Sequence, residues 1–111
     1  MTEVFDIVYL FGFSLRYGNE INRLTPVLKT HKKHGLKIGI ILIHDGVIGI
    51  DKNGKIPTIL DELKGISVYA TLPDLAARGI LIDSLLEEIK PIEYSALVDI
   101  LDNSQRIISW M

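Results

Sequence analysis

Residues 36–43 read Leu-Lys-Ile-Gly-Ile-Ile-Leu-Ile and say more about the architecture than any other stretch. Apart from Lys37, the run is apolar or glycine, and it does not alternate between apolar and polar residues. A strand with this pattern is covered on both faces, as in parallel or mixed sheets sandwiched between helices. His44, Asp45 and Gly46 follow and predict a polar turn. We therefore predict a layered α/β fold with a central strand here.

Strand-like and helix-like segments alternate on both sides of this stretch. β-branched and aromatic residues predict strands, and apolar residues three and four apart predict helices. We expect strands at 4–11, 66–70 and 106–110, and helices from Asn19 or Asn22 to His34, at 57–64, at 73–78 and at 93–102. The secondary structure of residues 85–90 stays ambiguous, and Pro91 interrupts the segment. The alternation favours a single three-layer, flavodoxin-like domain over 1–111, with a mainly parallel sheet and helices on both faces.

Two of these helices carry more specific expectations. The apolar face of the first is formed by Ile21, Leu24, Val27 and Leu28. Pro26 should lie in the first turn of that helix or kink it, and Gly35 should end the segment with a positive φ. The apolar face of the helix at 93–102 is formed by Tyr94, Leu97, Val98 and Leu101.

Length and composition exclude several classes of protein. The 111 residues match one domain, and a net charge of −2 provides no basic field for binding nucleic acid by this chain alone. No uncharged stretch approaches the roughly 20 apolar residues that span a bilayer. The acidic N-terminus does not have the layout of a signal peptide, so we expect a cytoplasmic protein. The absence of cysteine excludes disulfides, thiolate metal sites and a cysteine nucleophile.

The segment Gly12–Gly18 places two glycines and Arg16 after a predicted strand. Such a loop could cradle a phosphate, but it matches neither the dinucleotide fingerprint nor the P-loop and lacks the Lys-Ser/Thr pair. The alternative is a loop whose aromatic residues pack on the sheet or on a partner. Both interpretations remain open at this point.

Histidines offer two further hypotheses. His44 and Asp45 suggest a general base with its orienting carboxylate, although neighbours on a strand point to opposite faces. The alternative is a polar stop after a buried strand. His31 and His34 could share a helix face, but zinc needs further ligands that the sequence does not specify. We therefore predict no metal and no cofactor.

Asp74 and Arg78 lie four residues apart on a predicted short helix, in the favourable order for an ion pair. Arginine and tryptophan are also enriched at subunit interfaces. Arg78 and Trp110 are therefore either structural residues or contacts with another chain.

Ordered blocks over residues 36–111 resemble the TusB/DsrH branch of the DsrE/DsrF/DsrH sulfur-relay family. The blocks are Asp45-Gly46-Val47, Val68-Tyr69-Ala70, Asp74-Leu75 with Ala77-Arg78-Gly79, Ile92-Glu93-Tyr94 and Ser109-Trp110. The resemblance implies a compact flavodoxin-like fold and small subunits that assemble, commonly as a heterohexamer. Such complexes pass persulfide sulfur toward the wobble uridine of transfer RNA, or serve dissimilatory sulfur metabolism.

In this family a cysteine carries the persulfide, most clearly on the DsrE-like subunit. This chain has none and cannot carry the sulfur itself. The resemblance therefore implies a non-catalytic subunit with DsrE/DsrF-like partners in a hetero- or homo-oligomer, touching transfer RNA only indirectly and no membrane. The candidate interface residues are Asp45, Gly46, Arg78, Gly79 and Trp110. The alternatives are an enzyme that uses His44 and Asp45, or a small-ligand protein that uses the Gly12–Gly18 loop.

Overall fold

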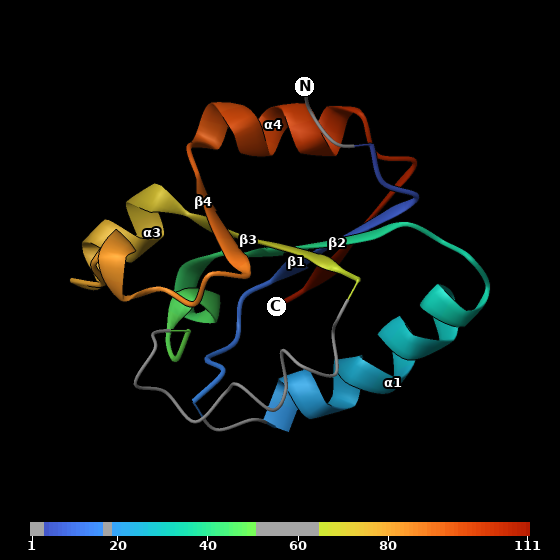
Figure 1. Ribbon diagram of the computed structural model, residues 1–111, viewed down its shortest axis with the longest axis horizontal. Coiled ribbons are helices and arrows are strands. Elements are labelled where there is room, and N and C mark those ends of the chain that lie inside the picture. Colours follow the sequence, from blue (N-terminus) through green and yellow to red (C-terminus); the bar gives the residue numbers. More distant parts are fainter. Residues whose placement is uncertain (1–3, 17–18, 51–64) are drawn as a thin grey trace.

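The computed structural model describes residues 4–16, 19–50 and 65–111. Within these ranges the chain forms a sheet with the strand order β4-β3-β2-β1-β5, and all neighbouring strands are parallel (Figure 1). The strands are β1 (Ile7–Phe11), β2 (Ile38–Leu42), β3 (Ser67–Thr71), β4 (Ile89–Ile92) and β5 (Arg106–Trp110). The helices are α1 (Asn19–Lys33), α3 (Leu72–Ala77) and α4 (Tyr94–Asp102), with short 3₁₀ helices η1 (His44–Val47) and η2 (Ile82–Ser84). The predicted helix at 57–64 lies outside the described residues.

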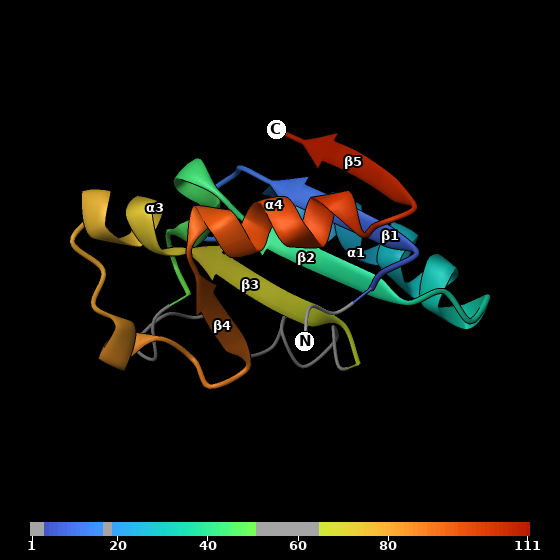
Figure 2. The same ribbon diagram turned by 90° about the horizontal axis from the view of Figure 1, so that it is seen from above.

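The sheet is the middle of three layers. α1 covers one face and α4 covers the other (Figure 1). Figure 2 shows α3 beyond the arrowhead of β3, at the edge where the strands end. The predicted α/β fold with helices on both faces is confirmed, and the sheet is parallel at every described pairing. In the described part of the chain, no helix has the length and apolar character needed to cross a membrane.

β2 is buried at every residue, and it lies between β1 and β3. Ile40 and Leu42 belong to the apolar cluster on the α1 side, whereas Ile41 belongs to the cluster on the α4 side. The ring of Phe5 packs over Gly39, where a Cβ would lie only 3.0 Å from the ring. The apolar run is therefore a strand covered on both faces, as its pattern predicts.

α1 buries the face predicted for it. The residues packed toward the sheet are Ile21, Leu24, Val27 and Leu28. Pro26 lies inside the helix and not in its first turn, so it has no N–H to donate to the carbonyl of Asn22. Both residues are exposed, and water can satisfy that carbonyl. The hydroxyls of Thr25 and Thr30 donate to the carbonyls of Ile21 and Pro26, at 2.7 and 3.0 Å.

In the C-terminal part, the structure resolves one open assignment and corrects one expectation. The ambiguous residues 85–90 contain the start of β4, an edge strand in which Pro91 lies opposite Ala70. An edge strand has one side without a neighbour and tolerates a residue that lacks an N–H. In α4, Tyr94 and Val98 are exposed by 47% and 60%. The side packed on the sheet is formed by Leu97, Ile100 and Leu101.

A buried tyrosine connects β1 to α1. Tyr9 is 1% exposed, and its hydroxyl lies 3.0 Å from Nδ1 of His31. Burial raises the pKa of Tyr9 above its ordinary value of 10.0. The folded protein therefore holds the phenol proton more tightly than the unfolded chain does. The resulting stability is complete below the unfolded pKa and is lost as pH rises through the folded pKa.

We expect Tyr9→Phe to remove this alkaline loss of stability. From about pH 9 upward, where the unfolded tyrosine begins to ionise, the free energy of unfolding should fall more steeply for the wild type than for the variant. Urea unfolding followed by circular dichroism measures both curves. Lysines titrate in the same range in both proteins, so the difference between the curves isolates Tyr9. Parallel curves would contradict the coupling between this ionisation and folding.

Candidate functional site

Four polar side chains meet where β2 and β3 end. His44 and Asp45 lie on η1, and Asp74 and Arg78 lie on α3 or directly after it. Nε and Nη2 of Arg78 donate to Oδ1 of Asp45 at 3.4 and 3.1 Å. Nη1 of Arg78 donates to the carbonyl of Asp74 at 3.3 Å and lies 3.6 Å from its carboxylate. The guanidinium is therefore fixed between two acidic residues from different elements.

Asp74 is the buried centre of this cluster. It is 8% exposed, and its Oδ2 accepts a hydrogen bond from the hydroxyl of Thr71, the fully buried last residue of β3. Its Oδ1 faces Arg78. A buried carboxylate is costly unless it is paired and hydrogen-bonded, and this one is both. The predicted Asp74–Arg78 pair is confirmed, although its acidic partner is buried and not on the surface as an exposed pair would be.

His44 has a φ of 49°, in the left-handed region that few residues other than glycine adopt. Its side chain is 66% exposed, and its Nδ1 lies 4.0 Å from Oδ1 of Asp74. This distance exceeds the reach of about 2.6–3.2 Å that proton transfer between a base and its orienting group needs. Asp45 is engaged by Arg78 and makes no described hydrogen bond to His44. The geometry does not favour the hypothesis of an enzyme built on His44 and Asp45.

Gly46 lies where η1 crosses the end of β1. A Cβ at this position would lie 2.2 Å from the carbonyl oxygen of Phe11, which itself accepts a hydrogen bond from the N–H of Ile43 at 3.0 Å. No real side chain fits so close to a backbone atom. Gly46 thereby allows the turn to carry its neighbour Asp45 to Arg78.

Gly79 follows α3 with a φ of 64°, and a Cβ there would meet nothing within 4 Å. It lines two hollows. The larger, of about 650 Å³, is mostly apolar and is lined by Leu72, Leu75, Ala76, Gly79, Ile80, Leu81, Ile82, Asp83 and Glu93. The smaller, of about 280 Å³, is lined by Arg16, Ile48, Gly49, Arg78, Gly79, Ile80, Leu81 and Ser84. The segment after α3 is therefore shared by two adjacent recesses.

Trp110 ends β5 opposite Phe11 of β1, at the same edge of the sheet but on another strand. It is half-buried on β5, packs against the core on the α1 side, and its indole N–H donates to Oε2 of Glu20 at 3.1 Å. None of its described hydrogen bonds joins it to Asp45 or Arg78. Its suggested role at an interface stays a prediction, separate from the cluster at the end of β2 and β3.

Residues of the remaining sequence hypotheses make local contacts in the structure. Within Gly12–Gly18, the ring of Phe13 packs edge-on against the ring of Phe11, with 6.0 Å between the ring centroids. Residues 17–18 lie outside the described residues. His31 is engaged by Tyr9 through Nδ1. Among the described residues, no group of three or more potential metal-ligating side chains is present.

Thr71 was not among the predicted site residues. The signal was available, because Thr71 precedes Asp74 by three positions, the spacing of a helix-capping pair. In the structure Thr71 is the N-cap of α3, but its hydroxyl donates to the Asp74 side chain and caps no backbone N–H. The three-residue spacing of Thr71 and Asp74 therefore identifies the hydroxyl that holds the buried carboxylate of the site.

Comparison with known proteins places the chain in a family. The profile described as "DsrH like protein" matches residues 19–107. The chain belongs to the DsrH-like family. This confirms the resemblance that the blocks Asp45-Gly46-Val47 and Ala77-Arg78-Gly79 indicated. Comparison with curated protein sequences finds no significant match.

Two solved structures share the fold. The ychN protein from E. coli is 18% identical, with a TM-score of 0.79 over 99% of this chain and 100% of that chain. The protein of unknown function MTH1491 from Methanobacterium thermoautotrophicum is 17% identical, with a TM-score of 0.65 over 90% of this chain and 96% of that chain. At these identities the similarity shows the architecture, and the family assignment comes from the sequence profile.

We expect Gly46→Ala to destabilise this DsrH-like protein strongly, because its new methyl would meet the backbone of β1. The predicted loss is about 2–3 kcal/mol of unfolding free energy, the range of a severe overpacking substitution. Gly12→Ala is the matched control, since its Cβ would meet only the flexible, exposed side chain of Met111, at 2.9 Å. Urea unfolding measures both, and equal losses would contradict the role assigned to the Gly46 contact.

We expect Thr71→Val to leave the buried carboxylate of Asp74 without its hydroxyl donor. The cost should be about 1–3 kcal/mol, the penalty of an unsatisfied buried polar group. Thr30→Val is the matched control, because the Thr30 hydroxyl is exposed and bonds only the carbonyl of Pro26, so its loss should cost under about 0.5 kcal/mol. Thermal unfolding of both variants compares them, and a Thr71→Val protein as stable as the Thr30→Val protein would contradict this assignment.

Proposed function

We propose that this chain is a non-catalytic subunit of a sulfur-relay complex, in which a DsrE-like partner carries the persulfide on its own cysteine. One observation carries the proposal: a member of the DsrH-like family has no cysteine among its 111 residues. Sulfane sulfur is held and passed on by thiolates, and no hydroxyl can replace them in that reaction. The contribution of this chain is therefore made through binding and positioning.

The surface we assign to the partner is the larger hollow beside Gly79. Leu81 and Ile82 stand at its side and are exposed by 72% and 54%. Contiguous exposed apolar residues of this kind are typical of protein–protein contacts. Asp83 and Glu93 also line the hollow, so the fitting partner segment is apolar and carries a basic residue. We assign this segment to the cysteine-bearing subunit.

Beside this surface, Arg78 and His44 offer donors to an anion on the partner. A deprotonated persulfide is such an anion, and a guanidinium already fixed by Asp45 and Asp74 can approach it with little loss of side-chain freedom. The carboxylate of Asp74 and the exposed side chain of His44 stand 4.0 Å apart at the same place. In this proposal these residues orient the partner's sulfur, and no bond to sulfur is formed by this chain.

The complex that we propose works in the cytoplasm and delivers sulfur either to the wobble uridine of transfer RNA or to dissimilatory sulfur metabolism. The net charge of −2 gives this subunit no basic field of its own. Contact with transfer RNA is therefore assigned to the partner subunits, and this chain takes part indirectly.

The test is purification of the tagged chain from its native cells, followed by native mass spectrometry. We expect small DsrE- or DsrF-like chains to co-purify, one of them with a reactive cysteine. Persulfide transfer by the reconstituted complex should fall about tenfold with Arg78→Ala, the loss of one charge-assisted contact. Arg23→Ala, which removes a 74% exposed arginine on α1, is the control and should leave transfer unchanged.

One outcome would contradict the whole proposal, and another would contradict its positioning part. Recovery of the chain only as a monomer or a homo-oligomer would remove the partner. Equal transfer by the wild-type and Arg78→Ala complexes would remove the positioning role while leaving the scaffold role in place. Because this chain has no cysteine, any persulfide found in the complex belongs to a partner subunit.

A further inference from the structure

The smaller hollow beside Gly79 differs in character from the apolar one. Its volume is about 280 Å³, and its walls come from three separate loops that follow β1, β2 and β3. Arg16 comes from the first loop, Ile48 and Gly49 from the second, and Arg78 from the third. In parallel α/β sheets, ligands bind where the strands end. The position of this hollow is therefore that of a ligand site.

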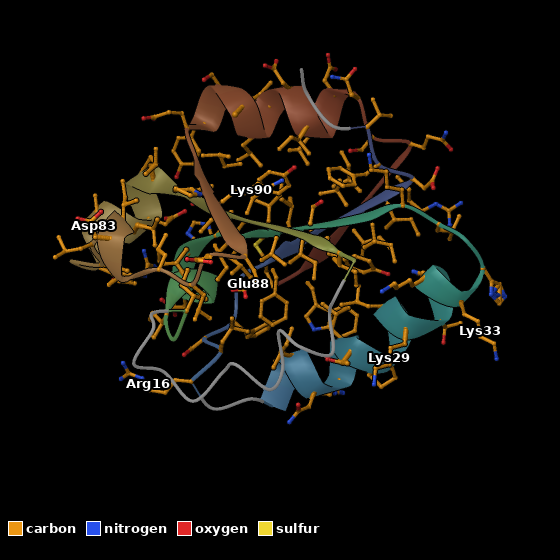
Figure 3. All side chains as sticks on the ribbon, in the orientation of Figure 1. Arg16, Lys29, Lys33, Asp83, Glu88 and Lys90 are labelled. Carbon is orange, nitrogen blue, oxygen red and sulfur yellow. The ribbon has the colours of Figure 1, made fainter. Side chains whose placement is uncertain are left out.

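The charged side chains that line this hollow are both arginines. Asp45 and Asp74 touch Arg78, but neither lines the hollow. Their effect is to hold the guanidinium in one orientation, so that little side-chain entropy is lost when a ligand binds. Asp83, an acidic residue near the same segment, lies well apart from Arg16 in Figure 3 and does not line this recess.

Arg16 completes the arrangement. It is exposed, and no described carboxylate lies within ion-pair distance of it. Asp45 and Asp74 offset the charge of Arg78, so Arg16 supplies the attraction for an anion, and Arg78 supplies oriented N–H donors. Gly49 and Gly79 also line the recess, with φ of 97° and 64°, and have no Cβ to fill the space. The recess is thus open, positively lined and shaped partly by backbone.

We propose that this recess binds a small oxyanion, with Arg16 and Arg78 as its cationic ligands. A volume of about 280 Å³ lies just below the range of about 300–1,000 Å³ that is usual for drug-sized ligands. A tetrahedral anion such as phosphate or sulfate fits this chemistry, because guanidinium groups bind its oxygens through paired hydrogen bonds. The anion is either free or the terminal phosphate group of a larger molecule. This inference does not depend on the proposed sulfur-relay function.

The probes are inorganic phosphate and sulfate, added to the purified chain with sodium chloride replaced so that ionic strength stays constant. We expect a saturable rise in melting temperature, together with shifts of the amide signals of Gly49 and Gly79 in NMR spectra. Arg16→Gln should weaken phosphate binding about tenfold, the loss of one charge-assisted ligand. A phosphorylated sugar and a phosphodiester are titrated for comparison. Binding of the phosphorylated sugar but not of the phosphodiester would indicate that the recess recognises a terminal phosphate group.

Arg23→Gln is the matched control, because it removes the same charge from α1, outside the recess. It should bind phosphate as the wild type does. The proposal is overturned if neither anion raises the melting temperature more than chloride does. It is also overturned if Arg23→Gln and Arg16→Gln reduce the affinity for phosphate equally. Arg16→Gln should still co-purify with partner subunits, so failure of this site and failure of the sulfur-relay proposal give different results.

Discussion

Burial of β2 on both faces is the constraint on which the rest of the fold depends. Its residues alternate between the cluster beneath α1, where Ile40 and Leu42 lie, and the cluster beneath α4, where Ile41 lies. An apolar strand of this kind is stable only when a layer covers each side and a strand lies along each edge. The polar residues His44 and Asp45, which follow this strand, must then lie outside the core. They lie on η1, at the end of the sheet and beside α3.

The candidate site follows from that exit. Asp45 follows β2 and is exposed, whereas Asp74 follows β3 and is buried. Arg78 contacts both, so that one guanidinium connects the ends of two neighbouring strands. An exposed ion pair contributes little to stability, whereas a buried carboxylate without partners is costly. Thr71 and Arg78 are the partners that make the buried position of Asp74 tolerable. The site is therefore held mainly from its buried side.

Local patterns were enough to predict much of this molecule. The terminal strand has its predicted bounds, 106–110, and Gly35 has the predicted positive φ, of 78°. β4 escaped prediction because Pro91 is acceptable only at a sheet edge, and edge position is a property of the whole fold. Asp45 and Arg78 are 33 positions apart in the sequence, and a local periodic pattern cannot predict a contact at that separation. The local Asp74–Arg78 spacing was visible, but the burial of Asp74 was not.

Folding alone does not account for the end of the sheet at β2 and β3. His44 keeps a left-handed backbone with an exposed side chain, a conformation that persists only where the surroundings impose it. Asp74 is buried with charged partners at a place where well-packed apolar groups often serve stability as well or better. Both features stand beside two adjoining hollows, one apolar and one lined by arginines. In the sulfur-relay complex that we propose, contact with a partner subunit would account for this strained backbone and buried charge.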